Sequence, residues 1–586
     1  MAELTGGELL VKCLKNEGVR HVFGLSGHGL VALMEALRTE EGIDFISSRH
    51  EENAAHMADG WARATGEIGV CCSTVGSGAA NLVAGLYEAY ADSSPVLAVS
   101  ANTQSFISYP FVGALESLDS AALYRPVTKW NATVHQRSRI PELIQRAFRE
   151  ALSGTPGPVH LDIPLDILCQ REETGDLPLP RSYRSSGRPR GDKTLIDRAA
   201  QVLLKAERPL LVAGGGVPAS EAWEEFQKLA DILGAPATST PMGSGSVSAR
   251  SPHFFGDGGW LGGSAVLQAL QEADVILAVG CHFSSWLGLG KPPVMTGFPS
   301  QKVIHVDIDP SRLGEQVATE IGIAGDAKSV LSDLLLAVNE YGGKGKADEK
   351  WAQNLVESYR QYLASLEPMM GGDGGPITMG RLAKEVGQYL ADRDAMVTVD
   401  GGMVFHWGFT YLHAYQPRRR FFCAGGGHLG FGQPFANAFK LAFPDRPVVN
   451  FCGDGAFGLS LQELDTAVRH GLPVVHVINN DGGWGMCKAG QLALYGGKAL
   501  EGIDQDFSGA NYAEIAKAFG CYGERVENPL EIRTALERAF KSGKPAVLDV
   551  KVQLTPHPMF AVMAQVVLKG VPLPQPGSPP ASGQGA

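Results

Sequence analysis

Two short segments place oxygen-bearing side chains directly after apolar, strand-like runs. The run at 448–452 ends in Gly453-Asp454-Gly455, and the run at 473–478 ends in Asn-Asn-Asp-Gly-Gly at 479–483. Because parallel strands present their carboxyl ends at one edge of a sheet, we expect these two ends to converge. Carboxylate, amide and carbonyl oxygens suit Mg²⁺ or Ca²⁺. The set is too small for a full cage, which favours Mg²⁺ completed by a diphosphate and water, with glycine amides close to phosphate oxygens.

A second acidic pair opens an alanine-rich helix in the segment 48–66. An acidic first turn often only complements the helix dipole, and this interpretation fits Glu52. The dipole interpretation fits Glu51 less well, because Glu51 follows the strand-like run 44–50 and is expected at the edge of a sheet.

A competing motif lies at 425–430, where the glycines fit G-x-G-x-x-G and Asp445 follows 20 residues after Gly425. This pattern is the basis of a different hypothesis, a dinucleotide-dependent oxidoreductase. It is a weak signal in a chain with 73 glycines, and Asp445 belongs to a Pro-Asp-Arg-Pro turn rather than a strand end.

Composition excludes several classes of protein. The 586 residues carry a formal net charge of −12, so a basic nucleic-acid surface is not expected. The chain contains no run of 18 apolar residues, so a membrane-spanning helix is not expected. The first residues lack the pattern of a secretory signal. The 9 cysteines form no C-x-x-C pair, which favours a reduced, cytoplasmic location without a zinc site.

Strand-like runs alternate with amphipathic helical stretches along most of the chain. The alternation predicts an α/β fold of three consecutive parallel-sheet domains. Polar or glycine-rich linkers give the boundaries 1–175, 193–342 and 375–560, and the Pro/Gly/Ser-rich tail 571–586 is expected to be disordered.

Two sequence echoes relate the first domain to the third. Residues 140–163 and 529–550 both read as an amphipathic helix, a small turn with proline and a buried strand. Residues 86–102 are similarly related to 464–480. Any α/β crossover can produce one echo, but two in the same order predict that the first and third domains share a fold.

The middle domain has its own possible ligand signals. Gly214, Gly215 and Gly216 follow a strand, and Asp307 and Asp309 follow another. An acidic residue at a strand end can bind a ribose hydroxyl. Alternatively, Asp309 only caps the next turn, since Pro310 follows it.

The two oxygen-rich turns resemble the signature of thiamine diphosphate (thiamine pyrophosphate, ThDP) enzymes. Over nearly its full length the chain is similar to the group of acetolactate synthase, benzaldehyde lyase and pyruvate decarboxylase. The resemblance implies that Asp454, a side chain 27 residues on and a carbonyl two further on bind Mg²⁺, here Asp481 and Gly483. Asn480 is the alternative second ligand. Asp481 is favoured because Trp484-Gly485-Met486 then also falls in register.

The resemblance also implies a bound cofactor and its contacts. Glu51 corresponds to the glutamate that bonds N1′ of the aminopyrimidine, which implies a catalytic acid–base role for it. Leu429 corresponds to the apolar wedge beneath the folded cofactor. Either His428 faces the cofactor as well, or it is a loop histidine pointing to solvent. The implied cofactor-binding set is Gly402, Met403, Gly427, His428, Leu429, Asp454, Gly455, Ala456, Asp481, Gly483, Trp484, Gly485 and Met486.

Several candidate pocket residues depart from the pattern of acetolactate synthase. Trp286 stands where that enzyme has an arginine thought to hold the second 2-oxo acid, and Gly490 stands in place of a tryptophan. His28 and Glu116 lie where relatives carry pocket residues, so both are catalytic candidates. A backbone-bonded turn histidine and a surface charge, respectively, are the alternatives. Gly76 contributes no side chain to the turn in which it lies.

Taken together, these features predict a ThDP- and Mg²⁺-dependent enzyme that forms or cleaves a C–C bond next to a carbonyl, most like an acetolactate synthase-type carboligase. A lyase, a decarboxylase or a cyclic 1,2-dione hydrolase remains an alternative. Small carbonyl compounds are the expected partners, with no nucleic acid and no membrane. The glycines and aspartates of the middle domain permit FAD. In the family, the two halves of the cofactor site come from different subunits, which implies a homodimer or homotetramer. A non-catalytic relative is disfavoured because Glu51 is present.

Overall fold

The computed structural model describes residues 2–110, 113–297, 299–496 and 500–569. The predicted tail 571–586 lies outside the described residues. The chain divides into two compact units. The first consists of Met1–Gly187, Cys423–Asp445 and Leu459–Val474, and the second of Arg188–Phe422, Arg446–Gly458 and Val475–Ala586.

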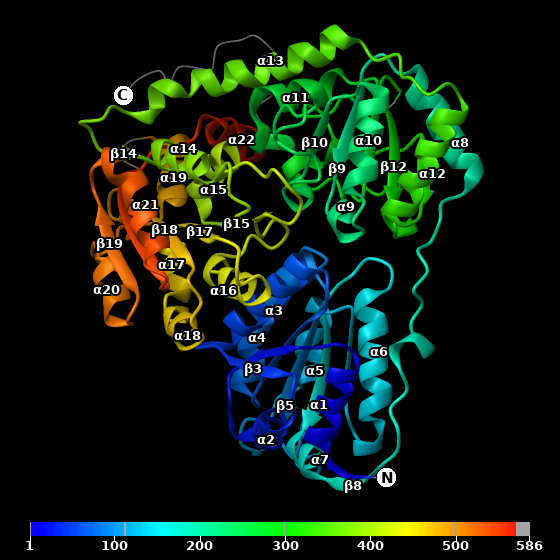
Figure 1. Cartoon of the computed structure of the whole chain (residues 1–586), viewed down its shortest axis with the longest axis vertical. Coiled ribbons are helices and arrows are strands. Elements are labelled where there is room, and N and C mark those ends of the chain that lie inside the picture. Colours follow the sequence, from blue (N-terminus) through cyan, green and yellow to red (C-terminus); the bar gives the residue numbers. More distant parts are fainter. Residues whose placement is uncertain (1, 111–112, 298, 497–499, 570–586) are drawn as a thin grey trace. The chain divides into compact units, whose positions relative to one another are not determined.

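The first unit is built on a parallel sheet that has six strands in the described part of the chain (Figure 1, blue to cyan). In spatial order these are β3 (Asp44–Ser47), β2 (His21–Gly24), β4 (Gly69–Ser73), β5 (Val96–Asn102), β7 (Val159–Pro164) and β6 (Trp130–Thr133). Every residue of β4, β5 and β7 is buried, as expected for strands covered on both faces. A short ribbon of β1 (Ala2–Thr5) and β8 (Arg171–Thr174) is antiparallel.

The helices of the first unit pack through apolar stripes and through small residues at close contacts. They are α1 (Gly6–Asn16), α2 (Val31–Thr39), α3 (Glu51–Thr65), α4 (Ser77–Ala91), α5 (Ser120–Tyr124), α6 (Ile140–Leu152) and α7 (Leu165–Cys169), together with α16 (Gly432–Ala442) and α18 (Glu463–Arg469). A Cβ added to Gly60 of α3 would lie 2.9 Å from Phe435 Cα of α16, so glycine permits this close packing.

The second unit holds two further sheets in its described residues (Figure 1, green and yellow to orange). The middle one has the order β10 (Ala237–Ser239), β9 (Pro209–Ala213), β11 (Val275–Val279), β12 (Lys302–Asp307) and β13 (Ile321–Ala324). Its helices are α8 (Lys193–Lys205), α9 (Gly216–Ala219), α10 (Trp223–Leu233), α11 (Gly263–Glu272) and α12 (Ala327–Glu340), and α13 (Glu349–Ser365) follows them.

The last sheet has seven strands in the part of the chain that the structure describes. The path is β14 (Ile377–Thr378), β20 (Ala546–Gln553), β18 (Val475–Asn480), β17 (Val448–Gly453), β15 (Met396–Asp400) and β16 (Arg420–Phe421), and β19 (Tyr522–Val526) also pairs with β20. The helices of this region are α14 (Met379–Leu390), α15 (Gly402–Tyr411), α17 (Asp454–Ser460), α19 (Gly485–Tyr495), α20 (Tyr512–Ala518), α21 (Ile532–Lys541) and α22 (Pro558–Lys569).

The first and last sheets share one strand order. The spatial order β3-β2-β4-β5-β7-β6 of the first sheet corresponds to the order β16-β15-β17-β18-β20-β19 of the last sheet. The first strand in chain order is β2 in one sheet and β15 in the other, and each later strand occupies the same place in both. All of these pairs are parallel. The predicted α/β class with alike first and third domains is therefore confirmed, although two helices that follow strands of the last sheet in the chain, α16 and α18, belong to the first unit.

In the middle sheet, the glycines and aspartates have local partners. A Cβ on Gly214 would lie 2.0 Å from the carbonyl oxygen of Gly280, so the glycine serves close backbone packing there. Asp309 accepts a hydrogen bond from the amide of Ser311, as the capping alternative predicts. Asp307 accepts from the amide of Asp309.

Two further observations concern the chain as a whole. All nine cysteines are free. Within the described residues, no helix has both the length and the apolar character needed to cross a membrane.

Candidate functional site

The two oxygen-rich turns converge at the carboxyl ends of β17 and β18, in the second unit. The carboxylate of Asp454 accepts hydrogen bonds from the amides of Gly455, Gly482 and Gly483 at 3.0, 2.9 and 3.1 Å. The second turn therefore wraps around the aspartate of the first. Asp454 is buried, and burial raises the pKa of its carboxyl.

Asp481 completes an acidic pair in this turn. Burial, followed by the charge of the neighbouring Asp454, raises the pKa of Asp481 to about 7. Its Oδ2 is buried and has no hydrogen-bond partner among the described residues. A buried oxygen without a partner is costly, so the turn has an unused ligand atom beside a second carboxylate.

Asn480 points elsewhere. Its side-chain amide donates to Asp549 Oδ1 of β20 at 2.8 Å, and Asp549 Oδ2 accepts from the amide of Tyr512. The adjacent Asn479 donates to the carbonyl of Cys452.

The same asparagine–aspartate bond occurs in the first sheet. Asn102, at the end of β5, donates to Asp162 Oδ2 of β7 at 2.7 Å. In both sheets the asparagine lies two residues beyond the residue paired with the aspartate, Ser100 in one case and Ile478 in the other. The bond is thus part of the repeated fold.

Neighbouring segments of the second unit enclose the turn. A Cβ on Gly402, at the start of α15, would lie 2.5 Å from Met486 Cβ. The amide of Phe507 donates to the carbonyl of Gly482, and that of Trp484 donates to Gln505. The rings of Trp484 and Phe507 meet edge to face at 5.1 Å, so residues 505–507 pack against the turn. The Trp484 ring also fills the space in front of Gly455.

In the first unit, Glu51 is the first residue of α3 and is buried. Its Oε2 accepts a hydrogen bond from Asn81 Nδ2 of α4 at 3.0 Å. A Cβ on Gly78 would lie 3.0 Å from Glu51 Oε1, so the glycine of the β4–α4 turn leaves room for the carboxylate.

His28 and Glu116 lie at the same turn. His28 Nε2 is 3.5 Å from Glu116 Oε2, and the histidine side chain is 60% exposed. A Cβ on Gly76 would lie 2.7 Å from Glu116 Cβ, and the amide of Gly29 donates to Thr74. The structure therefore gathers the three candidate catalytic residues around residues 74–78. Glu116 is an exposed residue, so its position is compatible with the surface-charge alternative as well as with a role beside His28.

The glycine-rich loop before α16 is held by carboxylates of the first unit. Asp92 accepts from the amides of Ala424 and Gly425, while Glu88 accepts from those of Gly426 and His428. These amides are the donors that a dinucleotide phosphate would need, and two carboxylates occupy them. Asp445 lies in a turn, as its sequence context predicts. Gly427 has φ of +67°, a conformation that favours glycine.

His428 points to α3 rather than to solvent. Its Nε2 lies 2.5 Å from Glu52 Oε1, and its ring is 4.7 Å from that of His56. Burial alone would raise the pKa of Glu52, but the hydrogen bonds and charges of His428 and His56 outweigh it and hold the pKa below its usual range. Glu52 therefore pairs with a histidine in addition to complementing the helix dipole.

Comparison with protein-family models gives matches in all three regions of the chain. Residues 4–123 match the thiamine pyrophosphate enzyme N-terminal TPP binding domain, 196–334 the central domain and 400–550 the C-terminal TPP binding domain. The probable acetolactate synthase large subunit of Methanocaldococcus jannaschii is 35% identical over 562 residues, covering 94% of this chain and 92% of that protein.

The chain belongs to the thiamine pyrophosphate enzyme family. Among other relatives of this enzyme, the acetolactate synthase large subunit of Haemophilus influenzae is 34% identical over 567 residues, covering 95% of this chain and 96% of the relative. Acetolactate synthase isozyme 3 large subunit of Escherichia coli is 32% identical over 577 residues, with the same two coverages. The three catalytic candidates fall within the matched N-terminal domain, and both turns fall within the matched C-terminal domain.

Sequence reasoning missed the partners that hold these side chains in the thiamine pyrophosphate enzyme. Asn81 bonds to Glu51, and Glu463 bonds to Arg49 and Asn53 on either side of Glu51. Neither Asn81 nor Glu463 belongs to a motif in the sequence. The order of the helices and strands hints at Asn81, because it lies in the first turns of the helix that follows β4. Glu463 lies more than 400 residues from Arg49, and the sequence holds no signal for that contact.

Proposed function

We propose that the protein is a ThDP- and Mg²⁺-dependent carboligase that joins a 2-oxo acid or 2-hydroxyketone donor to a carbonyl acceptor. The similarity over 94% of the chain to a protein named probable acetolactate synthase large subunit carries this proposal. The acidic pair at the ends of β17 and β18 supports it, because a diphosphate cofactor needs a divalent cation there.

The donors in the turn fit Mg²⁺. Asp454 and Asp481 supply buried carboxylate oxygens, and the Gly483 carbonyl is the third expected ligand. Asn480 is engaged by Asp549, in a bond that the first sheet repeats, so we assign the second ligand to Asp481. Water and the diphosphate would complete the coordination.

The remaining cofactor contacts follow from the resemblance. Gly402 and Met403 would lie against the diphosphate, and the Gly427 carbonyl and Leu429 against the pyrimidine and its fold. Gly402 and Gly427 carry no side chain, and Gly427 has the left-handed φ of +67° that favours glycine. Since this arrangement brings the halves of a site from two subunits in the family, we propose at least a homodimer.

Glu51 would hold and move a proton at N1′ of the aminopyrimidine. When bound, ThDP supplies the carbon nucleophile and the electron sink for bond making and breaking next to a carbonyl. Glu51 is suited to its role because it is buried and its carboxylate is oriented by Asn81. His28, paired with Glu116, would position a substrate carbonyl or carry a proton to it.

The surroundings of Trp286 bear on the choice of acceptor. Trp286, in place of the arginine of acetolactate synthase, packs edge-on against Phe405 and Phe422 at 5.2 and 5.7 Å. These aromatic surroundings favour an acceptor that carries no carboxylate of its own, such as an aldehyde. Lyase cleavage of a 2-hydroxyketone or of a 1,2-dione is the second candidate reaction. FAD stays a prediction, and no step is assigned to it, because Gly214 and Asp309 serve local packing and capping.

A product screen tests the reaction. Protein loaded with ThDP and Mg²⁺ is incubated with pyruvate or glyoxylate as donor, then with aldehydes, 2-oxo acids, acyloins or 1,2-diones, and products are identified by mass spectrometry. We expect a new C–C bond with pyruvate as donor. Cleavage of acyloins or diones without any ligation product would favour the second candidate instead.

Glu51→Gln tests the proton role independently of the substrate. We expect the variant to fold and bind ThDP, and to slow H/D exchange at C2 of the bound cofactor by about 100-fold or more, the range of general acid–base catalysis. Parent-like exchange would remove Glu51 from this role.

A further inference from the structure

Glu463 of α18 is a fully buried acidic residue outside the proposed site, with 0% of its surface exposed. Both oxygens of its carboxylate accept hydrogen bonds. Oε1 accepts from the backbone amide of Arg49 and from Asn53 Nδ2, both at 2.9 Å, and Oε2 accepts from Thr466 Oγ1 at 2.6 Å. Burying a charge is costly unless such donors surround it, so the carboxylate is tied to this arrangement.

The two donors to Oε1 bracket Glu51. Arg49 lies two residues before Glu51 and Asn53 two residues after it, and one oxygen atom of Glu463 bonds to both. The amide of Arg49 precedes α3 and Asn53 belongs to its first turn, so Glu463 joins the entry of the helix to its first turn.

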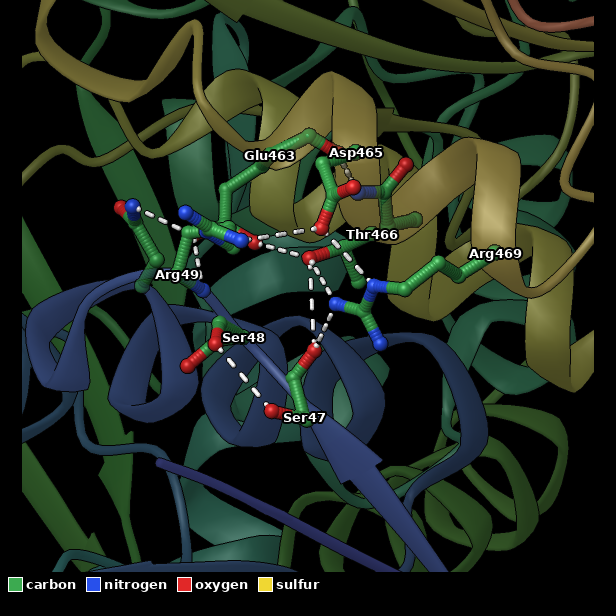
Figure 2. A network of polar contacts seen from close by, with 9 residues as sticks. Ser47, Ser48, Arg49, Glu463, Asp465, Thr466 and Arg469 are labelled. Atoms are coloured by element: carbon green, nitrogen blue, oxygen red, sulfur yellow. Dashed lines mark hydrogen bonds and ion pairs between the residues drawn. The ribbon is translucent and has the colours of Figure 1, made fainter. Parts of the chain in front are cut away.

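Figure 2 shows how the same helix holds the end of β3. Arg469 Nη2 donates to the carbonyl of Ser47 at 2.6 Å, and Thr466 Oγ1 lies 3.3 Å from that oxygen. Asp465 orients Arg469 through a 2.8 Å bond and lies 3.5 Å from Arg49 Nη1. The segment 47–53 is thus fixed by α18 along its length.

Glu51 itself is bound from another element. Its carboxylate bonds to Asn81 of α4, whereas Arg49 and Asn53 bond to α18. The backbone of Glu51 is therefore set by one helix and its carboxylate by another. A change at Glu463 acts on the segment around Glu51, so it alters where the backbone holds the carboxylate relative to Asn81 without removing any atom of Glu51.

We propose that Glu463 is a positioning residue for Glu51, which fixes the first turn of α3 so that the Glu51 carboxylate meets the aminopyrimidine at hydrogen-bond distance. This inference rests on the proposed function of Glu51. Reacting groups tolerate little displacement, because an error of about 1 Å can cost about 100-fold in rate.

The test uses full-length protein saturated with ThDP and Mg²⁺, and measures the rate of H/D exchange at C2 of the bound cofactor by acid quench and NMR. Glu463→Ala is expected to slow exchange by about tenfold or more at saturating ThDP. Glu463→Gln keeps an oxygen acceptor for Arg49 and Asn53, and is expected to stay within about threefold of the parent rate. Exchange at the parent rate in folded, ThDP-saturated Glu463→Ala would overturn the proposal.

A matched control separates positioning from general loss of stability. The side chain of Glu17, in the first unit, is also only 1% exposed and pairs with Arg184 and Tyr183. Glu17→Ala is expected to lower the melting temperature but leave the exchange rate unchanged. Should Glu463→Ala fail to fold, Asn53→Ala removes one arm of the bracket and is expected to slow exchange by about threefold or more. A parent-like rate in Asn53→Ala would then overturn the proposal.

A double-variant cycle shows whether Glu463 acts through Glu51. In the Glu51→Gln background, Glu463→Ala is expected to cause no further slowing, since the carboxylate to be positioned is absent. Additive slowing would overturn the positioning role. Parent-like exchange in Glu51→Gln alone would instead contradict the proposed function of Glu51, so the two failures are distinguishable.

Discussion

The first and last sheets have one strand order but different chemistry at the carboxyl ends of matching strands. The asparagine–aspartate bond is present in both, through Asn102 and Asp162 in one and Asn480 and Asp549 in the other. The residues that follow the two asparagines differ: Thr103 follows Asn102, and Asp481 follows Asn480. The two sheets thus share a topology, but the position after the asparagine carries a hydroxyl in the first sheet and a carboxylate in the last.

This difference teaches which polar residues belong to the fold and which to the chemistry. A bond found in both sheets cannot by itself indicate a metal, because the first sheet has it without the acidic pair. The carboxylates of Asp454 and Asp481 occur at the last sheet, and the buried Oδ2 of Asp481 has no partner among the described residues. We therefore assign metal binding to Asp454 and Asp481, and a structural role to the asparagine–aspartate bond.

The largest effect that sharpens the comparison is expected from Asp481→Ala. It removes a proposed ligand and leaves the Asn480–Asp549 bond in place. Mg²⁺-dependent binding of ThDP should weaken by about 10–100-fold, the range for loss of groups that build a metal site. Calorimetric titration measures it, with Asn480→Ala as the control that is expected to bind ThDP within about threefold of the parent.

If instead Asn480→Ala abolished binding and Asp481→Ala did not, the assignment of the second ligand would be reversed.

A smaller effect is expected when the repeated bond is removed from each sheet. Asn480→Ala and Asn102→Ala should each lower stability by about 1–3 kcal/mol, because each removes the amide donor of a buried carboxylate. Thermal unfolding of the two variants checks this, with Asn16→Ala as a surface control. Strongly different losses of stability in the two variants would contradict an equivalent role for the bond in the two sheets.

The smallest effect concerns the bond that joins α3 to the glycine-rich loop. Glu52→Gln should lower stability at pH 7 by about 1.5 kcal/mol, the low end for a hydrogen bond to a charged group, since the pair is partly exposed. The folded-state pKa of Glu52 lies below its unfolded value. Its contribution is therefore present above the unfolded pKa of about 4.3 and is lost as the pH falls from there towards the folded pKa.

Unfolding of parent and Glu52→Gln from pH 7 to pH 3 measures this dependence. The difference between them should shrink below about pH 4.3. A difference that grew with acidity would contradict the sign given to the pair.

The sequence predicts much of this architecture because its signals are local and periodic. Apolar runs and glycine turns indicate the strands, and the echo between 140–163 and 529–550 matches α6–β7 and α21–β20. The same logic predicted that Asp454 and the second turn would meet, since parallel strand ends share an edge.

Contacts between distant side chains could not be predicted in this way. His428 and Glu52 lie 376 residues apart, and their pairing depends on how the glycine-rich loop docks on α3. The choice between Asn480 and Asp481 is also open in the sequence, because both follow β18 and both carry oxygen ligands. It takes the position of Asp549 on the neighbouring strand to give Asn480 a partner.

The most direct test of the central claim is a calorimetric titration of ThDP into full-length protein, with and without Mg²⁺, for the parent and for Asp454→Ala. We predict saturable binding that requires Mg²⁺ in the parent and weakens by about 100-fold in the variant. Equal affinity in parent and variant, or no binding to the parent with both ThDP and Mg²⁺ in excess, would contradict the account.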